Sequence, residues 1–203
     1  MRKPKTSAID VIKRPYSQSD YSDEKTLLDL LLCAEDPVYF MRTYMRIQHA
    51  TRGSLPFNPY PFQERILKAL HEHRNNVVMC ARQSGKTTCA AGYLLWRAMF
   101  VPDSTILITA NKYVQALEVM DRVRYAYENI SDAIRCGVIE YNKGTISFDN
   151  GSRIVSRATS TDAGRGLSIS LLYCLAGETT VKVRDKETGE IQEVTLEELY
   201  NLL

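Results

Sequence analysis

Apolar residues recur at helical spacing in several stretches of the chain. Between residues 26 and 45 this pattern predicts two short helices, separated near Asp36-Pro37 because proline cannot continue a helix. Three further helices are predicted: one beginning near Phe62, an apolar one ending near Phe100, and a long one from Lys112 to Ile130. The apolar face of the long helix should comprise Val114, Leu117, Met120, Val123, Tyr127 and Ile130.

Three short runs are rich in apolar residues and contain no charged residue, namely NNVVMCA (75–81), STILITA (104–110) and LSISLLY (167–173). Such runs are typical of strands that are buried on both faces. The segment GTISFDNGSRIVSRA (144–158) predicts a hairpin, because its Asp-Asn-Gly turn tolerates positive φ. Since strands alternate with helices, the expected fold is α/β, with a parallel sheet and helices on both faces.

Composition and cysteine usage exclude several classes of protein. The 203 residues contain five cysteines, an odd number without a C-x-x-C pair, so neither a disulfide framework nor a zinc site is expected. The longest apolar stretch, 89–101, is interrupted by Arg97 and is too short to cross a membrane. The basic N-terminus has no apolar core and is interpreted as a polar leader, not a secretory signal. We therefore expect a cytoplasmic protein that does not bind a membrane.

The charge is distributed unevenly along the chain. Residues 174–203 contain three cations and seven anions, a net charge of −4, which leaves +6 for residues 1–173 from a total of +2. A basic body suits a nucleic-acid partner, although a charge of this size is weak evidence by itself.

The segment CARQSGKTT (80–88) has the features of a phosphate-binding loop, because it lies between a predicted strand and a predicted helix. Cys80 stands where the pattern G-x-x-x-x-G-K-[ST] has its first glycine, so the Walker A motif is deviant. Gly85 allows close approach of the backbone, Lys86 can reach the β- and γ-phosphates, and Thr87 can ligate Mg²⁺. The expected ATP-binding residues of the loop are Arg82, Gln83, Ser84, Gly85, Lys86, Thr87 and Thr88. Arg82 is a candidate arginine finger; the alternative is a surface salt bridge.

Four segments in order resemble the ATPase domain of the tailed-phage terminase large subunit: residues 36–67, 80–88, 107–118 and 164–173. The resemblance implies a P-loop NTPase fold and ATP-driven DNA packaging. It also places Arg82 at the position of the arginine in the family's Walker A loop. It also implies that Gln63, in YPFQ, contacts adenine; the alternative is a polar residue that only begins a helix. The implied partners are double-stranded DNA, the capsid portal and the small terminase subunit, and the implied assembly is a homo-oligomeric ring in the host cytoplasm.

The same family requires an Asp-Glu pair directly after its third strand, but Cys174, Leu175, Ala176 and Gly177 follow Tyr173. Instead, CLAGETTVKV (174–183) resembles the first block of an intein. The Cys174 thiol is a candidate splicing nucleophile that attacks the Tyr173 carbonyl and forms a thioester. The alternative is a core cysteine in a terminase with a diverged tail.

The tail has a small architecture of its own. Polar and apolar residues alternate on both sides of a turn at 187–189. A helix should begin after Thr195, with Glu198 completing a capping box. The predicted organisation is a leader and first helix (1–35), an incomplete terminase ATPase domain (36–173) and an N-terminal intein fragment (174–203).

We interpret the chain as a precursor for trans-splicing. Its partner would be a C-intein polypeptide whose C-extein carries the acidic Walker B pair and a nuclease, and the chain alone should not hydrolyse ATP at motor rates. Two alternatives remain at this stage: a truncated gene for an intein-containing terminase, and a helicase-like P-loop ATPase with a divergent tail.

Overall fold

The computed structural model describes residues 23–49, 51–81, 83–160, 163–175, 180–184 and 191–195. Arg82, the leader up to residue 22, the turn at 187–189 and the predicted helix after Thr195 lie outside these described residues. No helix in the described part is long and apolar enough to span a bilayer.

The five helices predicted before residue 131 are all present. They are α1 (Glu24–Glu35), α2 (Pro37–Tyr44), α3 (Pro61–Glu72), α4 (Lys86–Phe100) and α5 (Tyr113–Glu128). Asp36 separates α1 from α2 as expected, and its carboxylate accepts a hydrogen bond from the Val38 amide at 2.7 Å, which caps α2. A short antiparallel hairpin that the pattern did not predict, β1 (Arg46–His49) and β2 (Gly53–Pro56), lies between α2 and α3.

The core lies around α4, most of whose residues are buried. Trp96 of α4 is 2% exposed, and its indole N–H donates to the Cys33 carbonyl at 2.6 Å, which ties α4 to α1. The predicted apolar face of α5 is also buried, except that Val114 at its beginning is 66% exposed. α4 packs against α3 and α5, and α5 packs on β3 and β6, so apolar residues of both helices belong to one core.

The main sheet has five strands in the order β4-β5-β6-β3-β7. Its strands are β3 (Thr105–Ala110), β4 (Val138–Tyr141), β5 (Thr145–Phe148), β6 (Arg153–Ala158) and β7 (Leu171–Leu175). β6 and β7 flank β3 in parallel, whereas β4, β5 and β6 form an antiparallel meander. The predicted hairpin at 144–158 is confirmed, with Gly151 at φ +83° in its turn. The sheet is therefore mixed and not purely parallel.

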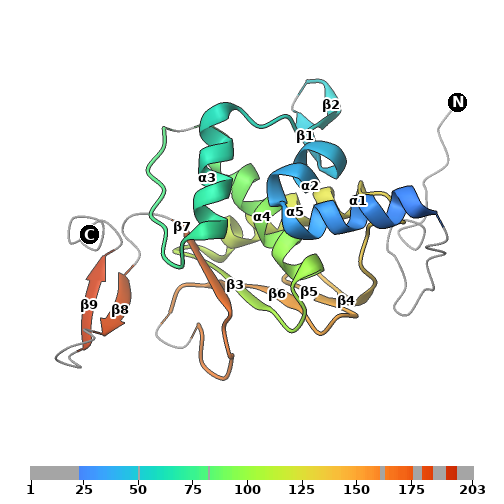
Figure 1. The fold of residues 1–203 in the computed structure, drawn as a ribbon. Coiled ribbons are helices and arrows are strands. Elements are labelled where there is room, and N and C mark those ends of the chain that lie inside the picture. Colours follow the sequence, from blue (N-terminus) through green and yellow to red (C-terminus); the bar gives the residue numbers. More distant parts are fainter. Residues whose placement is uncertain are drawn as a thin grey trace, which may run out of the picture.

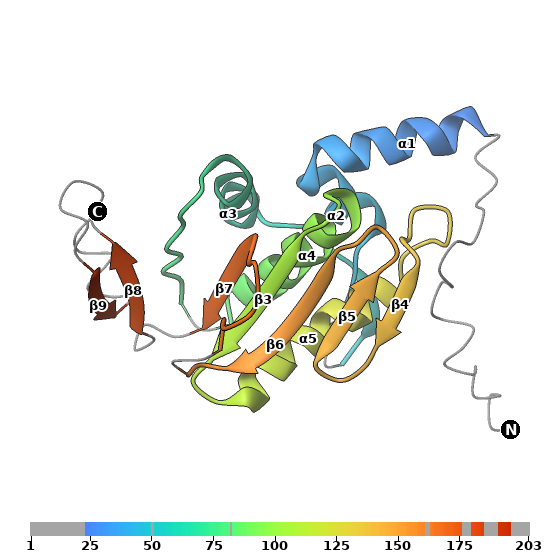
Figure 2. The same ribbon diagram turned by 90° about the horizontal axis from the view of Figure 1, so that it is seen from below.

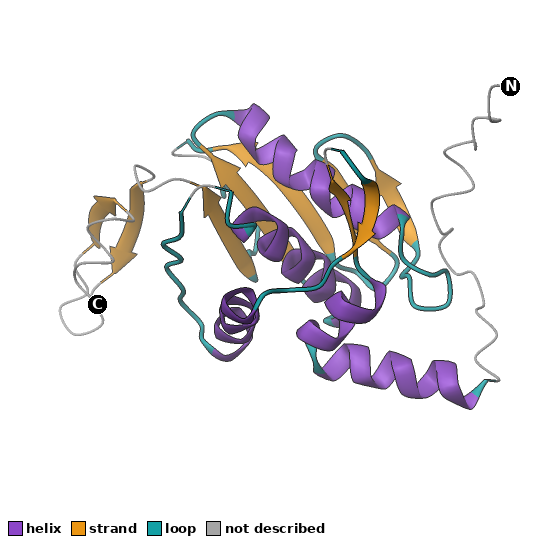
Figure 3. Ribbon diagram, turned by 90° about the horizontal axis from the view of Figure 1, so that it is seen from above, coloured by secondary structure: helices purple, strands orange, loops and turns teal. Residues whose placement is uncertain are grey.

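Helices cover one face of this sheet only, among the described residues, so the prediction of helices on both faces is wrong. Figure 1 shows the helices above the sheet, and the views from below and above (Figures 2 and 3) show its bare face and its covered face. The helix-free face carries Thr105, Leu107 and Thr109 of β3, which are all buried, and Arg157 of β6. The Arg157 guanidinium donates to the Ala163 carbonyl at 2.9 Å, which ties the chain after β6 to this strand.

Two of the three predicted strands differ from expectation. Residues 75–81 form no strand, and Val78 and Met79 are 37% and 69% exposed, because no described strand offers them a ladder of hydrogen bonds. The run 167–173 becomes a strand only from Leu171, lies at the sheet edge, and is half-buried. This strand also continues through Cys174 to Leu175, so the expectation that it ends at Tyr173 is corrected.

The tail contains the expected strand pair. β8 (Thr180–Arg184) and β9 (Ile191–Thr195) pair antiparallel, with Thr180 opposite Thr195 and Arg184 opposite Ile191. They make a two-stranded sheet separate from the main one, as Figure 2 shows.

Candidate nucleotide-binding site

The predicted phosphate loop makes a sharp turn into α4. Two of its residues adopt left-handed backbone conformations, Gln83 at φ 63° and Gly85 at φ +79°. Gly85 is the N-cap of α4, and Lys86 is the first residue of the helix. The Lys86 ammonium points back over the loop and donates to the Ala81 carbonyl at 3.5 Å. The loop therefore turns within a few residues and brings a cation to the beginning of a helix.

The beginning of α4 suits an anion. Gly85 makes no side-chain cap, so the first-turn amides at Lys86, Thr87 and Thr88 have no side-chain acceptor from the cap residue. Such amides, together with the helix dipole, favour a bound phosphate. The Ser84 hydroxyl oxygen is buried and has no hydrogen-bond partner within the described residues. These features fit the phosphates of a nucleotide.

Gln63 lies directly against this loop. It is 5% exposed, and its amide group donates to the Ser84 carbonyl at 2.9 Å. Its carbonyl oxygen accepts from the Tyr60 amide at 2.9 Å, which closes a capping box at the start of α3. The sequence singled out Gln63 but not its contact with the loop, since the contact joins residues that are 21 positions apart.

Thr87 lies beside the end of β7. Its hydroxyl is close enough to the Tyr173 phenol to influence the pKa of that group. Burial is the largest influence on the pKa of Tyr173 and raises it to about 12, against smaller lowering by Arg122 and by the Thr87 contact. The structure therefore brings the predicted Mg²⁺ ligand to the residue before Cys174, a contact that no sequence pattern indicated.

The described residues contain no group of three or more His, Cys, Asp or Glu side chains that could hold a metal ion. Thr87 is thus the one predicted metal ligand that the described part supplies, and nucleotide phosphates would have to provide further oxygen ligands.

Cys174 is held within the sheet. It is half-buried in β7 and lies opposite Thr109 of β3, whose hydroxyl donates to the Cys174 sulfur at 3.2 Å. Burial raises the pKa of the Cys174 thiol, and the Thr109 hydrogen bond lowers it by less. A raised pKa reduces the thiolate fraction near neutral pH, so this conformation does not activate the thiol.

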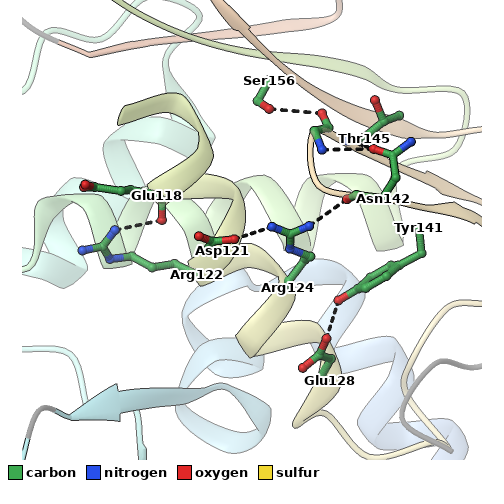
Figure 4. Close-up of polar contacts among 10 residues, drawn as sticks. Glu118, Asp121, Arg122, Arg124, Glu128, Tyr141, Asn142, Thr145 and Ser156 are labelled. Carbon is green, nitrogen blue, oxygen red and sulfur yellow. Dashed lines mark hydrogen bonds and ion pairs between the residues drawn. The ribbon is translucent and has the colours of Figure 1, made fainter. Parts of the chain in front are cut away.

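The polar face of α5 is occupied by local contacts (Figure 4). Arg124 pairs with Asp121 and donates to the Asn142 carbonyl at 2.8 Å, and Tyr141 donates to Glu128 at 2.7 Å. Arg122 donates to the Glu118 carbonyl at 2.9 Å. The bonds from Arg124 to Asn142 and from Tyr141 to Glu128 tie α5 to the β4–β5 hairpin, so the Arg124 guanidinium is already engaged within the fold.

Comparison with known proteins finds a family that resembles part of this chain. Residues 77–174 match the family described as "Terminase large subunit, T4likevirus-type, N-terminal". The matched segment contains the loop, α4, α5 and the main sheet, and ends at Cys174. Residues 77–174 are thus similar in sequence to the N-terminal part of a terminase large subunit, and the structure gives them an α/β fold.

A particular solved protein shares this fold. The crystal structure of the HK97 bacteriophage large terminase matches with a TM-score of 0.58 and 18% sequence identity, over 75% of this chain and 33% of that chain. At this identity the likeness establishes the fold alone. The chain spans about a third of the length of that terminase.

Proposed function

We propose that residues 36–173 are the N-terminal part of a viral DNA-packaging ATPase and bind ATP with Mg²⁺ through the loop at 83–88. The observation that carries this proposal is the turn at Gly85, which opens α4 with Lys86 and Thr87 in its first turn. This turn lies inside the segment that matches the terminase family. Such an ATPase would act in the cytoplasm of the host cell.

Each loop residue has a separate task in the proposed site. The amides of Gly85, Lys86, Thr87 and Thr88 would hold phosphate oxygens, and Lys86 would exchange the Ala81 carbonyl for the β- and γ-phosphates. Thr87 would turn its hydroxyl from Tyr173 toward Mg²⁺. When bound, Mg²⁺ neutralises charge on the phosphates. Arg82 stays a proposed arginine finger, and an acidic pair from outside residues 36–173 would orient the attacking water.

The nucleotide proposal is tested by replacing Lys86. Lys86→Ala should weaken binding of Mg²⁺-ATP about tenfold to a hundredfold, because hydrogen bonds to charged groups contribute roughly 1.5–3 kcal/mol. Isothermal titration calorimetry on the whole chain measures this loss. Lys68→Ala is the matched control, since Lys68 lies exposed on α3, and should bind as the wild type does. Equal affinity in the Lys86 and Lys68 variants would contradict the assignment.

We propose further that Cys174 begins a protein-splicing reaction. The resemblance of 174–183 to an intein block supports it, as do the end of the family match at Cys174 and the separate β8–β9 sheet. The sulfur would attack the Tyr173 carbonyl carbon, the bond from that carbon to the Cys174 nitrogen would break, and the thiol proton would pass to the freed amine. Cys174 and Leu175 pair with Thr109 and Ala110 of β3, so both residues must first leave the sheet.

The acyl group would then pass to a nucleophile of a partner polypeptide that carries the C-intein and the rest of the terminase. The completed protein would act on double-stranded DNA as a ring, with a capsid portal and a small terminase subunit. A truncated intein-containing gene and a helicase-like ATPase with a divergent tail are the competing interpretations.

Mixing the chain with such a partner tests the splicing proposal. Mass spectrometry should find a product joined after Tyr173, and ATPase activity should appear with the same time course. Cys174→Ala should block both, whereas Cys136→Ala, which changes another half-buried cysteine, should block neither. Ligation that persists in the Cys174 variant would contradict splicing, and motor-rate ATP hydrolysis by the unmixed chain would favour a self-sufficient ATPase.

A further inference from the structure

The Gln63 side chain makes two hydrogen bonds, each to a different segment of the protein. Its oxygen accepts from the Tyr60 amide and its nitrogen donates to the Ser84 carbonyl, both at 2.9 Å. The first bond fixes the side chain to the start of α3, and the second fixes the loop residue before Gly85. Gln63 therefore joins α3 to the phosphate loop through one rigid amide.

The contact with Gly85 is equally close. A Cβ atom added to Gly85 would lie 2.6 Å from the Gln63 amide nitrogen, which is closer than real Cβ contacts. Gly85 thus combines a left-handed backbone with a position where only hydrogen fits against Gln63. The turn that directs the first amides of α4 is packed directly on this side chain.

This arrangement is unfavourable for recognition of a base, because the amide is buried. Reading a purine edge requires the amide to present a donor and an acceptor outward together. Here the oxygen and the nitrogen of the amide each make one hydrogen bond within the protein, and the side chain is only 5% exposed, so little of the amide faces a ligand.

We infer that Gln63 is a positioning residue that holds the Ser84–Gly85 turn in its phosphate-binding conformation, and that it does not select adenine. This inference rests on the proposed function of the loop. Loss of Gln63 should therefore weaken the binding of every ligand that has the same phosphates, whatever base it carries.

The experiment compares Mg²⁺ complexes of ATP, GTP and inorganic tripolyphosphate on the whole chain. Gln63→Leu should lower affinity for all three by a similar factor, about tenfold, because the donor to Ser84 is lost. Gln63→Glu keeps an acceptor for the Tyr60 amide but loses the donor, so it should show the same uniform loss with α3 intact. Gln115→Leu, at the corresponding exposed position of α5, should bind all three as the wild type does. A loss confined to ATP would overturn the inference and favour an adenine contact.

A second measurement needs no ligand and separates the two proposals. Amide hydrogen exchange at residues 83–88 should be several-fold faster in Gln63→Leu and in Gln63→Glu than in the wild type. If the wild type binds none of the three ligands, the proposed function fails, while the exchange result still decides the role of Gln63. Unchanged exchange at 83–88 in both variants would overturn the positioning role.

Discussion

β3 and β7 are neighbouring parallel strands with similar apolar sequences, yet they have different environments. All six residues of β3 are buried, whereas β7 is half-buried. The pair Leu107 and Leu172 shows the contrast on a single face: they are register partners, but Leu107 is 1% exposed and Leu172 is 50% exposed. β3 has a strand on each side, and β7 is paired on one side only within the described sheet. The apolar run alone does not tell a central strand from an edge strand.

The largest expected effect compares these two leucines. Leu107→Ala should reduce the free energy of unfolding by about 2–5 kcal/mol, because Leu107 is fully buried and its loss leaves a cavity. Leu172→Ala should cost about 1 kcal/mol or less, since half of its side chain is already in water. Urea denaturation of both variants measures the difference. Equal losses would show that β7 is covered in solution and would remove the contrast.

High pH should lower the free energy of unfolding through two buried thiols of the core. Burial raises the pKa values of Cys33 and Cys89 from 9.0 to about 12, so the folded protein keeps protons that the unfolded chain releases. The stability from these thiols is fully present below pH 9 and is lost as pH rises toward 12, by up to about 1.4 kcal/mol per pH unit for each group. Cys89→Ala should flatten the decline measured by thermal or urea unfolding. A free energy of unfolding that stays constant from pH 8 to 11 would contradict this prediction.

The connection between the edge strand and the phosphate loop should have a smaller effect. Tyr173→Phe removes the phenol oxygen that lies near the Thr87 hydroxyl and should cost about 1 kcal/mol or less in the free energy of unfolding, while keeping the ring in place. Tyr125→Phe on α5 serves as a control for loss of a tyrosine hydroxyl and should change stability less. Equal losses in the two variants would mean that the Thr87 contact contributes nothing of its own.

The smallest predicted effect concerns the reactivity of Cys174. Thr109→Val removes the hydroxyl that lowers the pKa of the Cys174 thiol, so the pKa should rise further. Alkylation of Cys174 by iodoacetamide at pH 8.5 should then slow by a few-fold, as followed by mass spectrometry of the labelled peptide. Thr105→Val, on the same strand and face, should leave the rate unchanged. Faster alkylation in Thr109→Val would contradict the assigned direction.

Features that depend on nearby residues could be predicted well. The break at Asp36, the helix after the proline-rich stretch, α4, α5 and the hairpin at 144–158 all follow from spacing, caps and turn residues. The loop at 80–88 was also visible, because glycine, lysine and threonine stand at fixed spacing before an apolar helix. The tertiary contacts of these residues could not be predicted from such local patterns.

The sequence by itself determined the helices, the hairpin and the candidate chemistry at Gly85, Lys86 and Thr87, because helical periodicity and positive φ are local properties. Only the tertiary structure decided that residues 75–81 form no strand, that β7 is an edge and that Gln63 points into the loop. A strand needs a neighbour to accept its hydrogen bonds, and a buried amide turns toward whichever backbone groups the fold brings near it. Those partners are distant in sequence, so a local sequence pattern does not predict which of them will meet in the folded chain.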